Sequence, residues 1–382
     1  MNFELVATCM FGLEKLVGEE IDALGLTRTE TMDGRVSFLG SEVDVARANV
    51  NLRCAERVYV KIGSYPAKTF TELFDGAYSL EWENYIEKEN AFPVKGHAIK
   101  STLFSLPDCQ SILKKAISKR LGDKYNTSWM PESGQVCQIE FFIFKDIATL
   151  MIDTSGVALH KRGYRPVAGN APLRETLAAA LVKIARPRED ILLWDPFCGS
   201  GTIGIEAAMM MSGKAPGLYR RFSGEKIGFI GSNSFKLARD EAKNNIITDC
   251  KYEVYSSDID ESVLSLAREN AQRAGVLEYM KIFPADARKI KKPDDRKGTL
   301  ICNPPYGERM LEMSEAEALY RDIGKNFADF SPWQIYILTS NDTFPRHYGQ
   351  RADKMRKLYN GMIPCNLYQY FRPKEYYDNS SK

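Results

Sequence analysis

The pattern of hydrophobic and polar positions changes near residue 165. Before it, short apolar runs that predict strands alternate with segments whose apolar residues recur at helical spacing. Lys145-Asp146 lies between two β-rich runs and predicts a hairpin turn. This part of the chain is therefore predicted to be α+β. Its predicted elements are a strand over 3–9, helices over 13–24 and 111–121, and the hairpin strands 136–144 and 148–152.

From residue 172 onwards, strands and helices alternate regularly, and each strand leads into a polar loop. Such alternation is typical of an open, mainly parallel α/β sheet. Ligands bind these sheets outside the carboxyl ends of the strands, so we expect the polar loops to gather at one edge. The segment 160–166 between the two patterns is the predicted linker. The predicted strands cover 191–194, 254–257, 280–283 and 300–302, and the predicted helices cover 173–184, 203–211, 238–247 and 261–274.

The composition is that of an ordinary globular protein, with 44% hydrophobic and 27% charged residues among 382. No apolar run approaches the roughly 18 residues of a membrane helix. The first residues lack the basic start of a signal peptide, so we expect a cytoplasmic protein without a membrane partner. The eight cysteines include no Cys-x-x-Cys pair and the three histidines stand far apart, so we expect reduced thiols and no metal site.

The net charge of +2 identifies no partner, but the positive charge is clustered. Residues 95–124 hold seven Lys or Arg against two acids, and residues 158–188 and 343–374 each hold seven against one. Three basic patches on a near-neutral chain fit a polyanion such as nucleic acid. Three solvated faces would give the same pattern, and charge alone does not separate these interpretations.

The segment Asp195–Thr202 follows a predicted strand and precedes a predicted helix. Its Phe-x-Gly-x-Gly pattern predicts a tight turn whose backbone lies close to a ligand, and the free N–H groups of the helix start suit a phosphate or a carboxylate. It lacks the third glycine of the dinucleotide fingerprint and the Gly-Lys-Ser/Thr of a P-loop. A tight turn without a ligand is the alternative.

Two further aspartates stand at predicted strand ends. Asp258 is placed to accept hydrogen bonds from both hydroxyls of a ribose, whereas Asp260 is the better candidate for the helix cap. Asp286 is placed to accept from an adenine amino group, although an ordinary loop aspartate would look the same. With the glycine loop, the three positions match the amino acid, ribose and adenine of S-adenosylmethionine.

The fourth strand end carries Asn303-Pro304-Pro305-Tyr306. The two prolines exclude helix and central strand and leave a rigid turn with outward-pointing carbonyls. Two oxygen acceptors and an aromatic ring suit a planar base held by its exocyclic amino group. Acceptors on its N–H groups would align the nitrogen lone pair with a sulfonium methyl. The catalytic effect would come from alignment and fixed dipoles, without a strong general base.

These four motifs resemble those of class I S-adenosylmethionine-dependent amino-methyltransferases over residues 170–380. The resemblance implies a Rossmann-like α/β domain with a mostly parallel seven-stranded sheet and S-adenosylmethionine as cofactor. The connection between the glycine loop and Asp258 is longer than in a minimal domain of this class, and the sequence assigns no role to the insertion 212–253. The implied catalytic residues are Asn303, Pro304, Pro305 and Tyr306, and the implied cofactor-binding residues are Asp195, Phe197, Gly199, Ser200, Gly201, Thr202, Asp258, Asp286 and, in the preceding helix, Thr176.

The first part of the chain resembles a THUMP domain, an RNA-binding module. The resemblance lies in Ser105–Asp108 with the basic helix after it, in the hairpin, and in Asp153–Gly156. Phe11–Glu14 resembles the ferredoxin-like subdomain that precedes THUMP. The expected domains are therefore ferredoxin-like over 1–50, THUMP over 51–165 and class I methyltransferase over 166–382.

A THUMP domain followed by an Asn-Pro-Pro-Tyr methyltransferase is similar to the RlmL-type group of bacterial 23S ribosomal RNA guanine-N2 methyltransferases. Members of this group are often labelled N6-adenine-specific DNA methylases. The similarity implies 23S ribosomal RNA or a large-subunit precursor as partner, with the target base turned out of its stack. The expected phosphate-binding residues are Lys100, Lys114, Lys115, Lys119, Arg120, Lys161, Arg162 and Arg165.

Three alternatives remain at this stage. The same tetrapeptide serves adenine, so a DNA adenine-N6 methyltransferase is the first. A transfer RNA guanine-N2 methyltransferase is the second, because THUMP domains also occur there. An RNA-binding assembly factor without catalysis is the third, and the intact glycine loop and Asn303–Tyr306 disfavour it.

Overall fold

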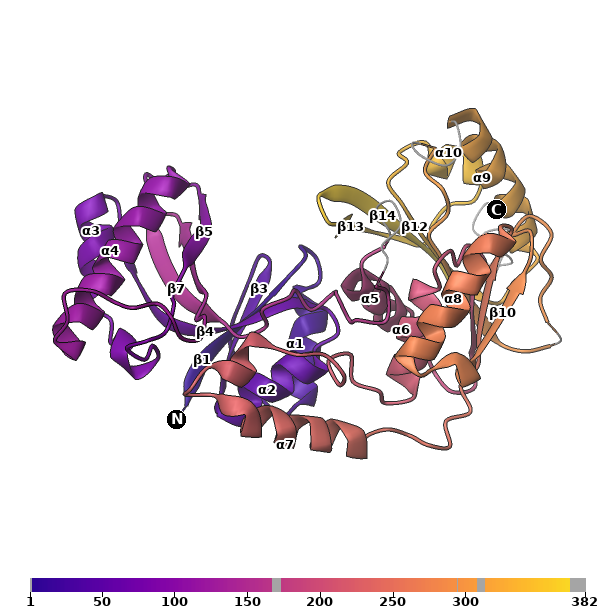
Figure 1. The fold of residues 1–382 in the computed structure, drawn as a ribbon. Coiled ribbons are helices and arrows are strands. Elements are labelled where there is room, and N and C mark those ends of the chain that lie inside the picture. The colour runs from indigo at the N-terminus through magenta and orange to yellow at the C-terminus, as the bar shows by residue number, and fades with distance from the viewer. Residues whose placement is uncertain (1, 167–172, 294, 308–312, 372–382) are drawn as a thin grey trace. The chain divides into compact units, whose positions relative to one another are not determined.

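The chain folds into two compact units (Figure 1). The computed structural model describes residues 2–166, 173–293, 295–307 and 313–371. Each unit is built from several chain segments. Unit 1 comprises Met1–Cys9, Val17–Leu159 and Gly217–Asn244, and unit 2 comprises Met10–Leu16, His160–Pro216 and Asn245–Lys382.

Unit 1 is organised around one seven-stranded sheet in the order β2-β3-β1-β4-β7-β6-β5. The long strand β4 joins its two halves, because it pairs antiparallel with both β1 and β7. The ferredoxin-like and THUMP regions expected from the sequence therefore share a sheet. The strands are β1 (Phe3–Cys9), β2 (Thr27–Met32), β3 (Arg35–Gly40), β4 (Ala55–Pro66), β5 (Val94–Ile99), β6 (Ile139–Phe144) and β7 (Ile147–Asp153).

The predicted β6–β7 hairpin is present. Its strands pair antiparallel, and Lys145 and Asp146 both have positive φ, of 50° and 62°. A two-residue turn of this kind matches the twist of the strands that it connects. The helices of the first two segments are α1 (Glu14–Ala23), α2 (Glu42–Asn51), α3 (Phe70–Ser79), α4 (Leu106–Tyr125) and the 3-10 turn η1 (Trp82–Asn84).

The insertion that had no role in the sequence belongs to unit 1. Its central part forms the 3-10 turn η2 (Ser223–Lys226) and helix α7 (Gly231–Asn244), which packs against α2. Arg47 of α2 donates two hydrogen bonds to the carboxylate of Glu241 in α7, at 2.8 and 3.0 Å. The sequence placed this stretch within the methyltransferase region, whereas by packing its central part belongs to unit 1. The helix predicted at 238–247 is displaced, because α7 begins and ends earlier.

Unit 2 contains a seven-stranded sheet in the order β10-β9-β8-β11-β12-β14-β13. Neighbouring strands from β10 to β12 are parallel, whereas β14 runs antiparallel to β12 and β13 antiparallel to β14. The expected α/β fold with a mostly parallel seven-stranded sheet is confirmed. The strands are β8 (Leu192–Asp195), β9 (Val254–Asp258), β10 (Met280–Pro284), β11 (Gly298–Cys302), β12 (Gln334–Thr339), β13 (Lys354–Asn360) and β14 (Ile363–Tyr370).

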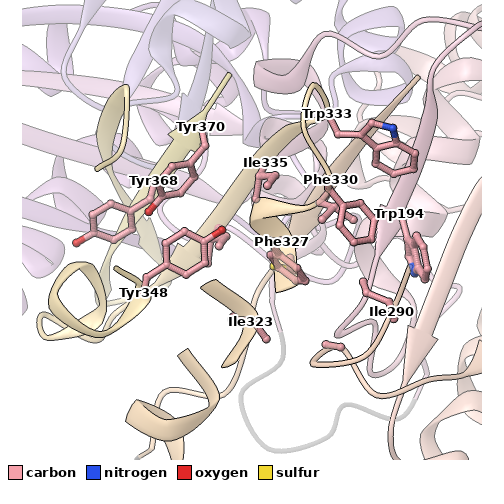
Figure 2. Packing of buried hydrophobic residues seen from close by; sticks show 14 of the residues in the cluster. Trp194, Ile290, Ile323, Phe327, Phe330, Trp333, Ile335, Tyr348, Tyr368 and Tyr370 are labelled. Atoms are coloured by element: carbon pink, nitrogen blue, oxygen red, sulfur yellow. The ribbon is translucent and has the colours of Figure 1, made fainter. Parts of the chain in front are cut away.

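An aromatic core fills one face of this sheet (Figure 2). Trp194 of β8 contacts Phe330, and Phe330 contacts Trp333, with ring centroids 6.1 and 5.4 Å apart. Helices α9 and α10 supply much of this layer, while α5, α6 and α8 pack together against the sheet. The helices are α5 (Glu175–Ala185), α6 (Thr202–Met211), α8 (Glu261–Ala274), α9 (Met313–Ala328), α10 (Phe344–Tyr348) and the 3-10 turn η3 (Leu277–Tyr279). No described helix is long and apolar enough to cross a membrane.

Candidate active site

The polar loops predicted from the sequence follow the carboxyl ends of four neighbouring parallel strands. Asp195 ends β8 and Asp258 ends β9, while Asp286 and Asn303 follow β10 and β11. Because these strands lie side by side in the order β10-β9-β8-β11, the loops share one edge of the sheet. Strand order reverses around β8, so the glycine loop occupies the switch point where such folds bind ligands.

The glycine loop combines an open side with a packed side. Gly199 has a φ of 47°, and a Cβ added there would meet no atom within 4 Å. Gly201 has a φ of 83°, and a Cβ added there would lie 3.2 Å from Ala267 of α8. At Gly199 the backbone thus borders free space, and at Gly201 a side chain would strain the turn and crowd α8.

Asp195 supports this loop from within unit 2. Its side chain is buried, and Oδ1 accepts a hydrogen bond from the Phe197 N–H at 3.1 Å. Burial raises the pKa of Asp195 well above its ordinary value, the Phe197 N–H opposes that rise, and the charge of Asp258 adds to it. A cation beside these two carboxylates would relieve their repulsion. The site therefore suits a ligand with a positively charged end, as S-adenosylmethionine has.

Asp258 links the glycine loop to the next strand end. Its Oδ2 accepts from the Gly199 N–H at 2.9 Å, and its Oδ1 accepts from the Asp260 N–H at 3.1 Å. Asp260 itself caps α8, because its carboxylate accepts from the Ser262 N–H. The capping role expected for Asp260 is thus present, and the Asp258 carboxylate retains acceptor positions for hydroxyl groups.

Asp286 is held by Arg288. The guanidinium donates to both carboxylate oxygens at 2.8 Å, and this pairing lowers the pKa of Asp286. An ionised carboxylate offers roughly four acceptor positions, so one more donor fits without breaking the pair.

The Asn303–Tyr306 loop is tied to unit 2 by hydrogen bonds from other elements. The Tyr320 hydroxyl of α9 donates to the Pro305 carbonyl at 2.7 Å, and Asn341 Nδ2 donates to the Tyr306 carbonyl at 3.1 Å. The Tyr306 hydroxyl donates to Asn303 Oδ1. These bonds hold the loop at a set position on the sheet edge.

The bond between Tyr306 and Asn303 adds to the predicted roles. An amide oxygen has two lone pairs, so Asn303 Oδ1 can accept from Tyr306 and from one further donor. Burial raises the pKa of the Tyr306 hydroxyl, which therefore stays protonated and orients the Asn303 amide.

Several residues of the site were missed at the sequence level. Asn341 lies in the polar loop after β12, so the strand-end rule applied to that strand would have found it. Asn270 of α8 donates to the Ser200 carbonyl at 3.1 Å, and Tyr320 reaches the site from α9. These two lie on helices, where spacing along the sequence gives no sign of a contact with a distant loop.

Two predicted phosphate-binding arginines are buried instead. The side chains of Arg162 and Arg165 are only 2% and 7% exposed. Arg162 pairs with Glu206 at 3.4 Å, while Arg165 pairs with Glu175 at 3.0 Å and donates to Thr202 Oγ1 at 2.9 Å. The prediction that these arginines contact RNA is wrong, because burial and carboxylate pairing remove them from the surface.

Burial also bears on two predictions for the segment before the glycine loop, the linker at 160–166 and the cofactor contact of Thr176. The predicted linker contains the buried Arg162 and Tyr164, so it is part of the unit 2 core. Thr176 is completely buried in α5, and its contact with the cofactor stays a prediction. The Thr202 hydroxyl accepts from Arg165, so this residue helps to join α6 to α5.

The predicted basic surface of unit 1 is smaller than expected. Lys100, Lys115 and Lys119 are exposed. Arg120 instead donates to both oxygens of Glu83, and this pairing lowers the pKa of Glu83 to about 2. The remaining two lysines differ: Lys114 pairs with Glu132 at 2.6 Å, and Lys161 of unit 2 is exposed.

The cysteines and metal ligands add no second chemistry at this edge. Burial raises the pKa of the Cys198 and Cys302 thiols, which opposes formation of a nucleophilic thiolate. Among the described residues, no group of three or more His, Cys, Asp or Glu side chains is arranged to hold a metal ion.

Three family models match successive parts of the chain. An RlmL ferredoxin-like domain matches residues 4–59, a THUMP domain matches residues 67–153, and the UPF0020 family, described as an RMKL-like methyltransferase domain, matches residues 162–369. These matches follow the order inferred from the motifs.

Similar proteins extend over nearly the whole chain. YpsC of Bacillus subtilis, provisionally named as an RNA methyltransferase, is 40% identical over 97% of this chain and 96% of its own length. The ribosomal RNA large subunit methyltransferase K/L of Psychromonas ingrahamii is 32% identical over 94% of this chain, which spans only 49% of that relative. The solved structure of SMU.472 complexed with SAH is 39% identical, with a TM-score of 0.90 over 97% of this chain and 98% of its own.

Proposed function

The chain belongs to the RMKL-like methyltransferase family, and a similar protein is known in complex with SAH. We propose that it transfers a methyl group from S-adenosylmethionine to the exocyclic N2 amine of a guanine in 23S ribosomal RNA. The observation that carries this proposal is that Asn303–Tyr306 follows β11 and the glycine loop follows the neighbouring strand β8. One loop suits a cofactor and its neighbour suits a planar amine.

The cofactor would lie along the edge formed by three aspartates. Asp195 and the free side of Gly199 would border the methionine end, Asp258 would accept from the ribose hydroxyls, and Asp286 would accept from the adenine amino group. Phe197, Ser200, Gly201 and Thr202 would shape the turn around the ligand. The bound cofactor supplies an activated methyl group on a sulfonium.

The residues of Asn303–Tyr306 would orient the target amine. Asn303 Oδ1 and the Pro304 carbonyl would accept from its two N–H groups, which turns the nitrogen lone pair towards the methyl group. The Tyr306 hydroxyl would keep the Asn303 amide in place, while its ring would stack on the base. The amine proton becomes acidic only as the methyl transfers, so a preorganised pair of acceptors is sufficient.

The substrate class rests on the first part of the chain. A THUMP domain matches unit 1, and a ribosomal RNA methyltransferase is among the similar proteins. The exposed Lys100, Lys115 and Lys119 would contact RNA phosphates. A large-subunit RNA substrate would also make this a cytoplasmic enzyme. The chain spans about half the length of that relative, whose activity could reside in the other half. The guanine N2 position and the 23S ribosomal RNA substrate are therefore proposed for this chain.

A direct test is methyl transfer from labelled S-adenosylmethionine to unmodified 23S ribosomal RNA, bulk transfer RNA and unmethylated DNA. Digestion and mass spectrometry would identify the modified nucleoside. We expect N2-methylguanosine from 23S ribosomal RNA. N2-methylguanosine from transfer RNA alone would change the substrate, and N6-methyldeoxyadenosine from DNA would overturn the proposal. Cofactor binding without product on naked RNA or a large-subunit precursor would support the assembly-factor alternative.

A further inference from the structure

The hairpin of β13 and β14 extends beyond the carboxyl ends of the parallel strands. Thr339, the last residue of β12, pairs with Asn366 of β14. β14 begins three residues earlier, at Ile363, so its first residues lie beyond the end of β12. Among the strands that the structure describes, this part of β14 pairs with β13 alone, up to the pair Asn360 and Ile363. The turn of the hairpin therefore projects on the edge that carries the candidate active site (Figure 1).

The projecting end lies next to the Asn303–Tyr306 loop. Cys365 of β14 has its Sγ 4.0 Å from the Tyr306 hydroxyl, which in turn donates to Asn303. Asn341, in the loop after β12, holds the Tyr306 carbonyl from a neighbouring strand. An RNA strand that delivers a base to this loop would pass the hairpin.

The hairpin carries charge of one sign. Residues 354–371 contain Lys354, Arg356 and Lys357 and no aspartate or glutamate. Lys354 and Lys357 are exposed, and neither forms an ion pair within the part of the chain that the structure describes. The three aspartates of the candidate active site stand at or just after the ends of β8, β9 and β10, whereas β13 is the strand at the other end of the sheet. The lysine charges are therefore separated from the cofactor loops and are available to phosphates.

An exposed aromatic residue stands beside Lys357. Phe11 is 54% exposed, and its ring packs edge-on against Tyr359 of β13, with centroids 6.0 Å apart. Lys357 Nζ lies 5.7 Å from the centroid of the same Tyr359 ring. The following glycine fits tightly, because a Cβ at Gly12 would lie 3.1 Å from the Lys357 carbonyl. Phe11 is thus held against the hairpin while much of its ring faces solvent.

The turn of the hairpin is held by Arg174, which directly precedes α5. The backbone N–H of Arg174 donates to Asn360 Oδ1 at 3.2 Å, and its guanidinium lies 3.4 Å from where a Gly361 Cβ would stand. Met362 follows and is 95% exposed. The projecting end therefore carries a basic and an aromatic side chain, Lys357 and Tyr359, on the face of the hairpin opposite Cys365, and the apolar Met362 at its turn.

We propose that this surface, defined as Phe11, Lys357, Tyr359 and Met362, binds the single-stranded RNA that flanks the target base. The inference rests on the proposed function and adds a second RNA contact, within unit 2. Lys357 would bind a phosphate, and the Phe11–Tyr359 pair would stack an unpaired neighbouring base. Lysines interleaved with exposed aromatics are the combination that single-stranded nucleic acid requires. Holding the flanking strand offsets part of the free energy needed to extrude the target base.

Charge favours RNA over a protein partner. A protein interface has a mainly apolar centre and is depleted in lysine, whereas here Lys357 lies beside the aromatic pair and the apolar Met362 stands alone at the turn. The absence of acids over 354–371 suits a polyanion of uniform charge.

The test compares the full chain with Phe11→Ala, Lys357→Ala and the double variant. Methyl transfer to 23S ribosomal RNA gives KM and kcat, and calorimetry gives the affinity for S-adenosylhomocysteine. We expect KM for RNA to rise about 3- to 10-fold in each single variant and more in the double variant. Lys357→Ala should also reduce the slope of log affinity against log salt by about 0.7. Cofactor affinity and melting temperature should stay unchanged.

A matched control is Lys325→Ala. Lys325 is exposed near the end of α9, just before β12 begins, and therefore lies at the opposite edge of the sheet. It removes the same charge from the same unit and should leave KM within about 2-fold. Lys357→Arg should restore the affinity for RNA, because it keeps the charge.

Two results would overturn the inference. The first is an unchanged KM in the double variant while the wild-type chain methylates RNA. The second is that a photoreactive side chain at position 362 crosslinks to a ribosomal protein but not to RNA. If the wild-type chain methylates no RNA at all, the proposed function fails instead, which separates the two failures.

Discussion

The two sheets place their functional candidates by different rules. In unit 2, Asp195, Asp258 and Asn303 come from distant parts of the sequence and still share one sheet edge. In unit 1, Lys115 and Arg120 lie on one helix only five positions apart, and yet one is exposed and the other is paired with Glu83. Topology thus collects the first set, whereas local packing divides the second.

The physical reason is the range of each constraint. Parallel strands carry their carboxyl ends to one edge, so a residue at a strand end is placed by the backbone alone. A charged side chain is placed by whichever partner lies within a few ångströms, and that partner is set by packing. Predictions from strand ends should therefore be more reliable than predictions from clusters of charge.

The largest expected effect comes from the strand-end class. Asn303→Ala should lower single-turnover methyl transfer by about 10³-fold, because it removes a preorganised acceptor of the target amine. Affinity for S-adenosylhomocysteine and for RNA should be retained. Asn245→Ala, an exposed asparagine of unit 2, is the control. Full methylation by Asn303→Ala would contradict the assignment of this loop.

The next effect tests whether Arg165, which the sequence predicted to contact RNA, instead stabilises the fold. Arg165→Met should lower the free energy of unfolding by about 3 kcal/mol, because it leaves the buried Glu175 carboxylate without its partner. Arg188→Met is the control, since the pair of Arg188 and Asp190 has side chains 66% and 64% exposed, and we expect a change below about 1 kcal/mol. Denaturant unfolding measures both. Equal effects would mean that burial does not distinguish the two pairs.

A smaller effect is expected at the ribose position. Asp258→Asn should weaken binding of S-adenosylhomocysteine by about 10-fold, because an amide replaces one of two carboxylate acceptors with a donor. Asp260→Asn keeps a good helix cap and should leave the affinity unchanged. Calorimetry on both variants would show whether the strand-end aspartate and the capping aspartate differ as proposed.

Within unit 1, the exposed and the paired basic residues should separate. The double variant Lys115→Ala and Lys119→Ala should weaken RNA binding by about 3- to 10-fold without lowering the melting temperature. Arg120→Ala should lower the melting temperature and change RNA affinity by less than about 2-fold. Filter binding and thermal unfolding measure the two properties. RNA affinity that depends on Arg120 would restore the interpretation based on charge alone.

The smallest effect is a pH dependence of the pair that Arg120 of α4 forms with Glu83 of η1. Arg120 lowers the pKa of Glu83 from 4.5 to about 2. A depressed folded-state pKa contributes stability above the ordinary pKa, and this contribution is lost as the pH falls towards 2. The difference in unfolding free energy between the wild type and Glu83→Gln should therefore shrink over that range. A difference that does not vary with pH would mean that the carboxylate charge is not what Arg120 stabilises.

Helix and strand positions followed closely from the sequence where caps and turns were distinctive. The helix at 261–274 has its predicted bounds, because Asp260 caps its start and Gly275 ends it with a φ of 66°. The helix predicted at 111–121 extends over Leu106–Tyr125, since Pro107 is compatible with a first helical turn. The helix of the insertion was displaced because no such cap marks its start.

The sequence by itself determined the order of the domains, the parallel sheet and the strand ends that carry Asp195, Asp258, Asp286 and Asn303. Periodicity and turn residues are local signals, and parallel topology converts them into one edge. Only the tertiary structure decided that Arg165 is an internal partner of Glu175, that Asn341 holds Tyr306, and that α7 belongs with α2. These facts depend on contacts between residues far apart in the chain, and no local spacing records which side chain meets which.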